Sequence, residues 1–267
     1  MSPEGPPASH PDAAAAASGY PGRPLPQPRS PRAAWPGLCE VCRRWTSGAW
    51  CRECERRFAA PVARCSRCAL AVAPAAVGAP CGDCLRDPPP FALAVCAFDY
   101  RFPWDRLIAA FKFDARVGLA RPLAAALADA VASMRAGTAS PSLPALVLPV
   151  PLGPARLRER GYNQAWELAR RVARRLALPA RADVLVRLGD APRQTALARS
   201  ERLRNLRDAF HVDPKARALV AGLPVALVDD VVTTGATARA ASAALLGAGA
   251  ARVELWALAR TPDPRAG

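Results

Sequence analysis

The 267-residue sequence contains no uninterrupted apolar stretch approaching 18 residues, the length that a membrane-spanning helix needs. Its first residues also lack the basic segment followed by an apolar one that marks a secretory signal peptide. We therefore expect a cytoplasmic protein with no membrane span. In a reducing compartment, the nine cysteines favour metal binding over disulfides.

Lysine is nearly absent, because Lys112 and Lys215 are the only lysines among 37 basic residues. Such a preference for arginine is typical of a GC-rich genome, but the net charge of +15 remains a physical property of the chain. The positive charge is densest between residues 156 and 207, a segment that contains 14 arginines and five acidic residues. This excess favours an anionic ligand or partner.

Composition divides the chain into three parts. Residues 1–34 are rich in proline and alanine and predict a disordered tail. Residues 35–88 hold eight of the nine cysteines, and residues 90–262 carry long apolar stretches. The length allows one substantial α/β domain beside a small module.

The cysteines of the small module form four CxxC pairs. A CxxC turn places two thiolates on one tetrahedral ion, and two such turns complete a structural zinc site. We therefore expect two structural zinc ions, with an iron–sulfur site or a disulfide network as the alternatives. Sequential pairing is the simpler arrangement, and a cross-braced one stays open. The expected ligands are Cys39, Cys42, Cys51, Cys54, Cys65, Cys68, Cys81 and Cys84.

The ninth cysteine, Cys96, lies in an apolar run and is expected to be a buried small side chain. Few large apolar residues occur in the cysteine module, so metal binding should supply its folding energy. Thiolates and zinc together also bring the charge of the module to about −1. Nucleic-acid affinity would then depend mainly on the larger domain.

The larger domain alternates strand and helix patterns, which predicts an α/β fold with a mostly parallel sheet. Helices are expected near 104–112, 118–135 and 163–177, and a rigid turn follows the strand Ala145–Val150 because proline stands at 149 and 151. The expected strands are 91–99, 145–150, 183–187, 209–212, 224–229 and 252–260.

The segment Val225–Thr237 carries the most specific pattern. Its apolar run Val225–Val228 predicts a buried parallel strand, and Asp229 and Asp230 follow where open α/β sheets bind ligands. Hydroxyls and backbone N–H groups come next, at the start of a helix expected over Ala236–Gly247, a position that attracts phosphate. These candidate phosphate-binding residues are Thr233, Thr234, Gly235, Ala236 and Thr237. The alternative is an ordinary strand end with two solvated acids.

This segment resembles the phosphoribosyl pyrophosphate (PRPP) loop of the type I phosphoribosyltransferases. A second segment, Leu148–Ala165, is similar to the characteristic segment of the ComF/GntX family, in which a double zinc ribbon often precedes the phosphoribosyltransferase domain. Further similarities are Phe111-Lys112-Phe113 and the stretch from Gln194 to Phe210. The chain is therefore identified as a member of this family over about residues 36–260.

The resemblance implies roles for particular residues. Asp229 and Asp230 would hold the ribose hydroxyls, and the loop Thr233–Thr237 would bind the 5′-phosphate, with Mg²⁺ bridging pyrophosphate and ribose. Arg202 and Asn205 are expected on a loop over the site. Thr233 stands where the 6-oxopurine salvage enzymes carry an aspartate, which disfavours hypoxanthine or guanine as the acceptor. The pyrophosphate would be held by Val150, Pro151, Leu152, Arg158, Arg160 and Lys112.

Two functions follow from the resemblance. One is a phosphoribosyltransferase whose acceptor the sequence does not identify. The other is a non-catalytic protein of the transformation machinery, with single-stranded DNA and competence proteins as partners, that grips a 5′-phosphate in the PRPP-type site. A strand would then run across the arginine face of the 163–177 helix, which is alternatively a solvated helix face. This face consists of Arg170, Arg171, Arg174 and Arg175.

Overall fold

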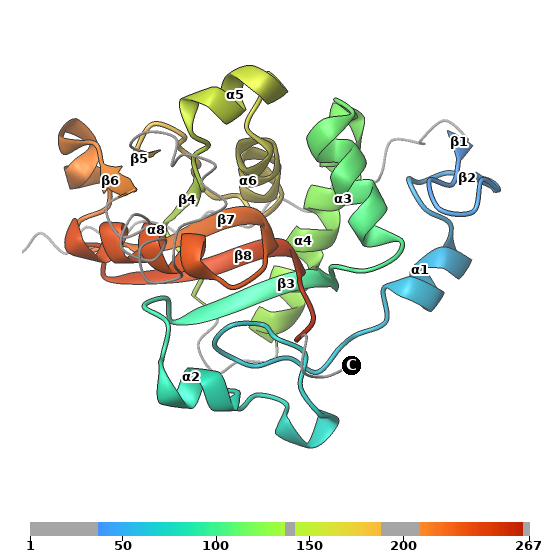
Figure 1. Ribbon diagram of the computed structural model, residues 1–267, viewed down its shortest axis with the longest axis horizontal. Helices are drawn as coiled ribbons and strands as arrows, with labels where there is room; N and C mark the ends of the chain where they lie inside the picture. Colours follow the sequence, from blue (N-terminus) through green and yellow to red (C-terminus); the bar gives the residue numbers. More distant parts are fainter. Residues whose placement is uncertain (1–36, 137–141, 188–208, 264–267) are drawn as a thin grey trace, which may run out of the picture. The chain divides into compact units, whose positions relative to one another are not determined.

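Four parallel strands form the central sheet of the computed structural model, which describes residues 37–136, 142–187 and 209–263 (Figure 1). The order across the sheet is β3-β8-β7-β4. Strands β7 and β8 lie in the middle and are nearly continuous in apolar residues, as a sheet covered on both faces requires. The bounds are β3 Leu93–Asp99, β4 Leu146–Pro149, β7 Pro224–Val232 and β8 Arg252–Arg260.

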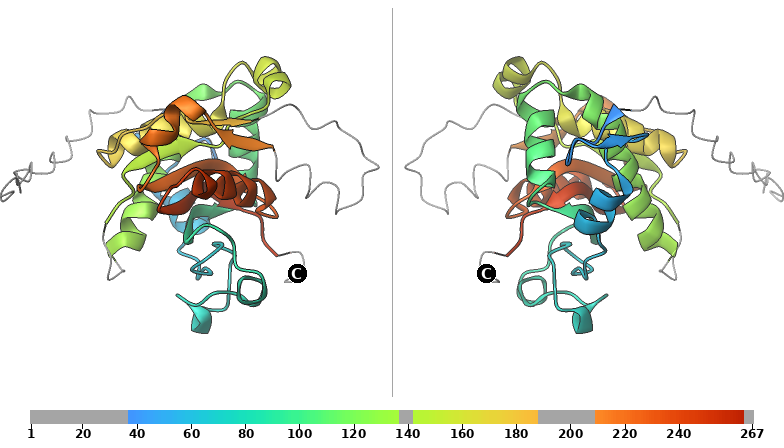
Figure 2. Two further views of the ribbon diagram at one scale, coloured as in Figure 1. Left: turned by 90° about the vertical axis from the view of Figure 1, so that its left-hand side faces the viewer. Right: turned by 90° about the vertical axis from the view of Figure 1, so that its right-hand side faces the viewer.

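Helices cover both faces of this sheet (Figure 1, Figure 2). Ala226 and Val228 of β7 pack into a core shared with α3, α4 and α6, whereas Val225 and Leu227 pack into a core shared with α8. Alternate residues of a strand point to opposite faces, so β7 alone distinguishes the two helix layers. The helix bounds are α3 Trp104–Phe113, α4 Ala120–Ala136, α6 Gln164–Arg175 and α8 Ala236–Gly247.

The segment Val117–Ala136 is long and apolar enough, by length and composition alone, to cross a membrane. It comprises the short 3-10 turn η2 (Val117–Leu119) and α4, whose Leu123, Leu127 and Val131 are fully buried in the core. The core helix of a water-soluble domain passes the same test, and burial against the sheet accounts for these apolar residues.

Two of the expected strands do not join the parallel sheet. β5 (Leu185–Arg187) and β6 (Phe210–Val212) pair antiparallel with each other in a separate two-stranded sheet. The free edge of β4, where a further strand would pair, is instead bonded to the chain around Ala180: the Val147 N–H donates to the Pro179 carbonyl at 3.0 Å. Leu185 and Phe210 pack on the α8 side of the sheet.

The cysteine-bearing segment contains only short elements, β1 Gly37–Leu38, β2 Trp45–Thr46, α1 Arg52–Phe58, η1 Pro74–Ala76 and α2 Gly82–Arg86. It packs directly on the sheet domain. The Trp104 indole N–H donates to the Phe58 carbonyl at 2.8 Å, and Trp50 stands edge-on to Trp104 with ring centroids 5.2 Å apart. The remaining elements are α5 Pro154–Arg160 and the 3-10 helix η3 Pro214–Leu219.

Candidate functional site

The two acids of the candidate site lie inside β7 rather than beyond its end. β4 pairs with β7 only as far as Pro149 and Val228, whereas β8 continues the pairing to Val232. The expected strand end at 229 is therefore wrong by three residues, because a neighbouring strand prolongs β7. Asp229 and Asp230 occupy the step at which β4 leaves the sheet, so one edge of the strand is open beside them.

Asp229 and Asp230 point to opposite faces of the sheet, as neighbours in a strand must. Asp230 points to the α3 side, where the Lys112 ammonium lies 2.8 Å from its Oδ1. Both side chains of this pair are largely buried, with 14% and 13% exposure. The structure thus joins Lys112 and Asp230, which are more than a hundred positions apart in the sequence.

Asp229 points to the α8 side, beside the candidate phosphate loop Thr233–Thr237. Burial and the neighbouring charge of Asp230 raise the pKa of its carboxyl to about 7, against weaker opposing effects of the Asp230 N–H and of Lys112. That N–H donates to Asp229 Oδ1 at 2.8 Å. A carboxyl with a pKa near neutrality, beside a hollow, is typical of functional sites.

The candidate phosphate loop Thr233–Thr237 leads into α8, which spans the expected residues. Gly235 caps the helix with φ +79°, a left-handed conformation that favours glycine. Thr234 Oγ1 accepts the Ala236 N–H at 3.3 Å, while the next N–H groups of the first turn have no helical partner. A hollow of about 30 Å³ lies between Asp229 and this turn, with Thr233, Gly235, Ala236 and Thr237 in its wall.

The turn after β4 stands next to the acids. The Val150 N–H donates to the Val228 carbonyl at 2.8 Å, and Pro151 and Leu152 follow as half-buried residues. Arg160 is half-buried at the end of α5, and its guanidinium lies 4.9 Å from the Phe113 ring centroid. Arg158 lies on the exposed surface of α5. The structure therefore gathers Lys112 and Val150 at the acids, but gives Arg158 no such place.

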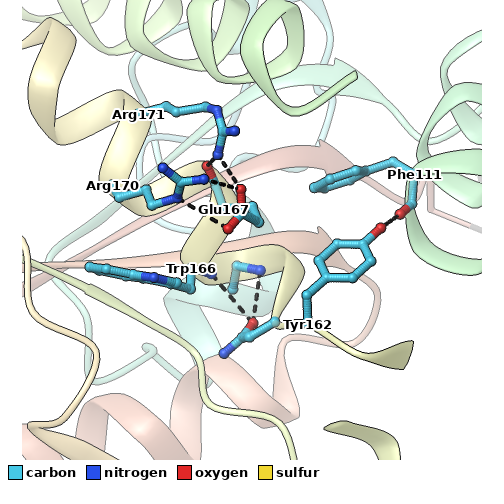
Figure 3. Close-up of polar contacts among 8 residues, drawn as sticks. Phe111, Tyr162, Trp166, Glu167, Arg170 and Arg171 are labelled. Atoms are coloured by element: carbon cyan, nitrogen blue, oxygen red, sulfur yellow. Dashed lines mark hydrogen bonds and ion pairs between the residues drawn. The ribbon is translucent and has the colours of Figure 1, made fainter. Parts of the chain in front are cut away.

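The arginine face of α6 is largely engaged in ion pairs, and Figure 3 shows those of Arg170 and Arg171. Arg170 and Arg171 both bind Glu167, and Arg175 Nη2 lies 2.7 Å from Asp129 Oδ1 of α4. Burial of Glu167 opposes its ionisation, but the two arginines outweigh it and lower the pKa of that carboxyl. α6 begins at Gln164, which contacts the Lys112 carbonyl, and it rises about 1.5 Å per residue, so its last arginines lie about 17 Å along the axis from this start.

The eight paired cysteines form two clusters, Cys39–Cys42–Cys51–Cys54 and Cys65–Cys68–Cys81–Cys84, which confirms sequential pairing. A tetrahedral zinc ion with Zn–S bonds of about 2.3 Å places its sulfurs about 3.8 Å apart. The Cys42 and Cys51 sulfurs are 3.7 Å apart, as are those of Cys68 and Cys81. Both clusters therefore fit zinc. Cys96 is buried in the core and belongs to neither.

The two clusters are copies of one structural unit. In each, the residue after the first CxxC has positive φ (Arg43, 63°; Ala69, 56°), and the second CxxC begins a helix. The Cys51 N–H donates to Cys39 Sγ at 3.3 Å, and the Cys81 N–H donates to Cys65 Sγ at 3.1 Å. Burial raises the pKa of the Cys39 thiol, but such N–H donors outweigh it and bring the pKa to about 6. This favours the thiolate that binds metal.

Two arginines connect the second cluster to the candidate phosphate loop Thr233–Thr237. Arg260, at the end of β8, donates to the Val232 and Thr233 carbonyls and, through Nε, to the Cys68 carbonyl at 3.3 Å. Arg239, in the first turn of α8, donates to the Asp87 carbonyl at 2.6 Å. A pocket of about 100 Å³ lies between cluster and loop. The sequence analysis identified neither Arg239 nor Arg260. For Arg260 the sequence contained a signal, because this arginine stands at the end of an apolar strand.

Some expectations fall on residues that the structure does not describe. Arg202 and Asn205, the expected loop over the site, lie outside the described residues, as does the tail of residues 1–34. Of the described tryptophans, Trp104 and Trp256 are buried packing residues.

No family model matches the sequence. The chain is 36% identical over 229 residues to "DNA utilization protein YhgH" of Salmonella typhi, a match that covers 85% of this chain and 98% of the relative. The YhgH protein of Escherichia coli K12 is 35% identical over the same length. "Competence protein F" of Haemophilus influenzae is 35% identical over 180 residues, which cover 67% of this chain and 78% of the relative.

Solved structures with a similar arrangement include the glutamine PRPP amidotransferase of B. subtilis, with 18% identity and a TM-score of 0.37 over 55% of this chain and 30% of that one. The adenine phosphoribosyltransferase of Leishmania tarentolae has 19% identity and a TM-score of 0.31 over 49% and 55%. The level of sequence identity to the curated relatives, sustained over most of both chains, decides the assignment. With these relatives, the chain belongs to the ComF/GntX family.

Proposed function

We propose that this chain is a cytoplasmic protein of DNA utilization that binds PRPP, or the 5′-phosphate of a related ligand, at the open edge of β7. The observation that supports this most directly is the union of three groups at one place. The Lys112–Asp230 ion pair, the raised-pKa carboxyl of Asp229 and the first turn of α8 meet beside the same strand.

The chemistry of these groups suits a sugar phosphate. The N–H groups at the start of α8 would bind a 5′-phosphate, because the helix dipole adds to their donors. Asp229 and Asp230 would accept bonds from the ribose hydroxyls. Mg²⁺ would enter with PRPP, bound mainly to phosphate oxygens, and Asp229 is the carboxylate that fits it because Asp230 already pairs with Lys112.

With pyrophosphate as leaving group, such a site would perform phosphoribosyl transfer. The Lys112 ammonium and the Val150 turn would stabilise charge on the leaving group, a role supported by their place beside Asp229 and Asp230. A carboxylate at position 229 or 230 would stabilise positive charge that develops on the ribose ring.

The test is calorimetric titration of the zinc-loaded protein with PRPP and Mg²⁺. The double variant D229N/D230N should lose at least about tenfold in affinity, since two bonds to the ribose lose the negative charge that strengthens them. The matched control is Asp183→Asn, which changes an exposed carboxylate of the same domain. Equal PRPP binding by the wild type and the double variant would refute this site.

A second candidate is single-stranded DNA binding without catalysis. The names of the relatives and the arginine excess between 156 and 207 favour it. The same titration decides between the two when a 5′-phosphorylated and a 5′-hydroxyl strand replace PRPP. A preference for the phosphorylated strand that D229N/D230N leaves intact, without pyrophosphate release from PRPP, supports the DNA-binding candidate alone.

A further inference from the structure

The short corner between α5 and α6 contacts two of the ligand-binding segments proposed above. We define it as the α5–α6 corner, residues 160–164, with the sequence Arg-Gly-Tyr-Asn-Gln. It runs from Arg160, the last residue of α5, through Gly161 with φ +75°, to Gln164, the first residue of α6. Tyr162 and Gln164 contact the end of α3, and Asn163 contacts both the start of α6 and the turn after β4.

The first contact is with the end of α3. The last carbonyls of a helix lack helical partners and need donors from elsewhere. The Tyr162 hydroxyl donates to the Phe111 carbonyl (Figure 3). Gln164 Nε2 donates to the Lys112 carbonyl at 3.4 Å. The two side chains therefore hold the backbone on both sides of the Lys112 Cα.

Gln164 is itself held in place. Its side chain is only 1% exposed, so its amide must find partners inside the protein. Arg160 Nη1 donates to Gln164 Oε1 at 3.0 Å, and the same guanidinium lies over the Phe113 ring. All three residues of the Phe111–Phe113 segment are thus contacted from the corner.

The second contact is with the turn after β4. Asn163 caps α6, because its Oδ1 accepts the Ala165 N–H at 2.9 Å. The other half of the same amide, Nδ2, donates to the Val150 carbonyl at 3.1 Å. Val150 is bonded through its own N–H to Val228, the residue before Asp229. One amide therefore ties the start of α6 to the turn beside the acids.

We propose that Tyr162, Asn163 and Gln164 are positioning residues, which hold Lys112 against Asp230 and the Val150 turn against β7. As a statement about ligand binding, the inference rests on the proposed function. As a statement about Lys112 it does not, because the Lys112–Asp230 pair exists in the protein without ligand. The two parts can therefore fail separately.

The scarcity of lysine allows a test that needs no ligand. Lys112 is largely buried and paired, whereas Lys215 is exposed. Acylation of the full-length, zinc-loaded protein by an amine-reactive ester, followed by peptide mass spectrometry, measures both rates in one sample. Tyr162→Phe should speed acylation of Lys112 several-fold and leave Lys215 unchanged. Tyr100→Phe, at another half-buried tyrosine of the same core, is the control and should change neither rate.

A second variant separates the two contacts. Asn163→Asp keeps the oxygen that caps α6, and aspartate caps helices as well as asparagine does, but a carboxylate cannot donate to Val150. It should weaken PRPP binding several-fold without changing the acylation rate of Lys112. Tyr162→Phe and Lys112→Met should be non-additive in PRPP affinity if the tyrosine acts through the lysine.

Unchanged Lys112 acylation in Tyr162→Phe would overturn the inference for α3, and normal PRPP affinity of Asn163→Asp would overturn it for the Val150 turn. Additive effects of Tyr162→Phe and Lys112→Met would show that the tyrosine supports stability only. If the wild type binds no PRPP while Tyr162→Phe still exposes Lys112, the proposed function fails and the positioning of Lys112 stands.

Discussion

Replacing Asp229 with Asn should stabilise the protein without ligand and at the same time weaken its binding of PRPP. Burial and the charge of Asp230 raise the pKa of Asp229 from 3.8 to about 7, so its ionised form is unfavourable in the folded chain. Asparagine has the same shape, and its oxygen can still accept the Asp230 N–H. The substitution therefore removes the charge and little else.

The magnitude follows from the pKa difference between folded and unfolded protein. The folded pKa is the higher one, so the stability that a protonated Asp229 contributes is complete below about pH 4 and is lost as the pH rises through about 7. At about 1.4 kcal/mol per pKa unit, the loss approaches about 4 kcal/mol, an upper value for a half-buried group. The advantage of D229N should grow by about 1 kcal/mol between pH 6 and pH 8.

Urea unfolding of the zinc-loaded protein at these two pH values measures the effect. D230N is the informative partner, because it breaks the 2.8 Å pair with Lys112 and leaves a buried ammonium without its carboxylate. It should destabilise the protein where D229N stabilises it. If both variants change the free energy of unfolding in the same direction, or if the advantage of D229N is independent of pH, the two carboxyls do not have the separate environments described above.

Two further predictions concern the metal clusters and the phosphate loop. Elemental analysis should find two zinc ions in the wild type and one in either Cys54→Ser or Cys84→Ser. Only Cys84→Ser should weaken PRPP binding strongly, because Arg260 connects the cluster of Cys84 to the loop. An iron chromophore in the wild type, or equal PRPP affinities of the two variants, would contradict this. Gly235→Ala should weaken PRPP binding about tenfold at unchanged zinc content, since the conformation at φ +79° disfavours alanine although the nearest atom leaves room for its methyl group; calorimetry of the purified variant measures it.

The sequence predicts best what local chemistry decides. The bounds expected for the helix Ala236–Gly247 agree with those in the structure. The start of this helix is determined locally, by a glycine with positive φ and a threonine hydroxyl within three positions. The apolar run Val225–Val228, which predicts the preceding strand, is an equally local signal. The amino-acid sequence alone therefore suffices to predict two acids beside a phosphate loop.

Elements that depend on distant partners are predicted less well. β7 extends to Val232 only because β8 pairs with it there, and residues 229–232 themselves do not predict this pairing. β5 and β6 have the composition of strands, but the edge of β4 that they would extend is taken by the chain at Pro179–Arg181. The pairing of cysteines is a similar case, since four identical CxxC motifs are compatible with either wiring and only their positions in space decide between the two.

The contacts that place Lys112 leave even less trace in a sequence, for a physical reason. Tyr162, Asn163 and Gln164 all donate to backbone carbonyls, and every residue type offers a carbonyl. Only the donor of each bond therefore depends on the type of side chain. For this reason the corner is recognisable in the sequence as a motif, whereas the residues whose carbonyls it contacts are not.

Arg260 follows the same rule, because each of its acceptors is a carbonyl: those of Val232 and Thr233 at the end of β7, that of Cys68 in the second cluster and that of the neighbouring Thr261. A side chain that binds carbonyls of two segments fixes the distance between their backbones. This contact does not depend on which side chains the two segments have. Cluster and loop can thus vary in sequence while their geometry stays coupled. This coupling gives the cysteine module a structural reason to accompany the sheet domain: without the module, Arg260 and Arg239 beside the loop Thr233–Thr237 would lose their acceptors, the Cys68 and Asp87 carbonyls.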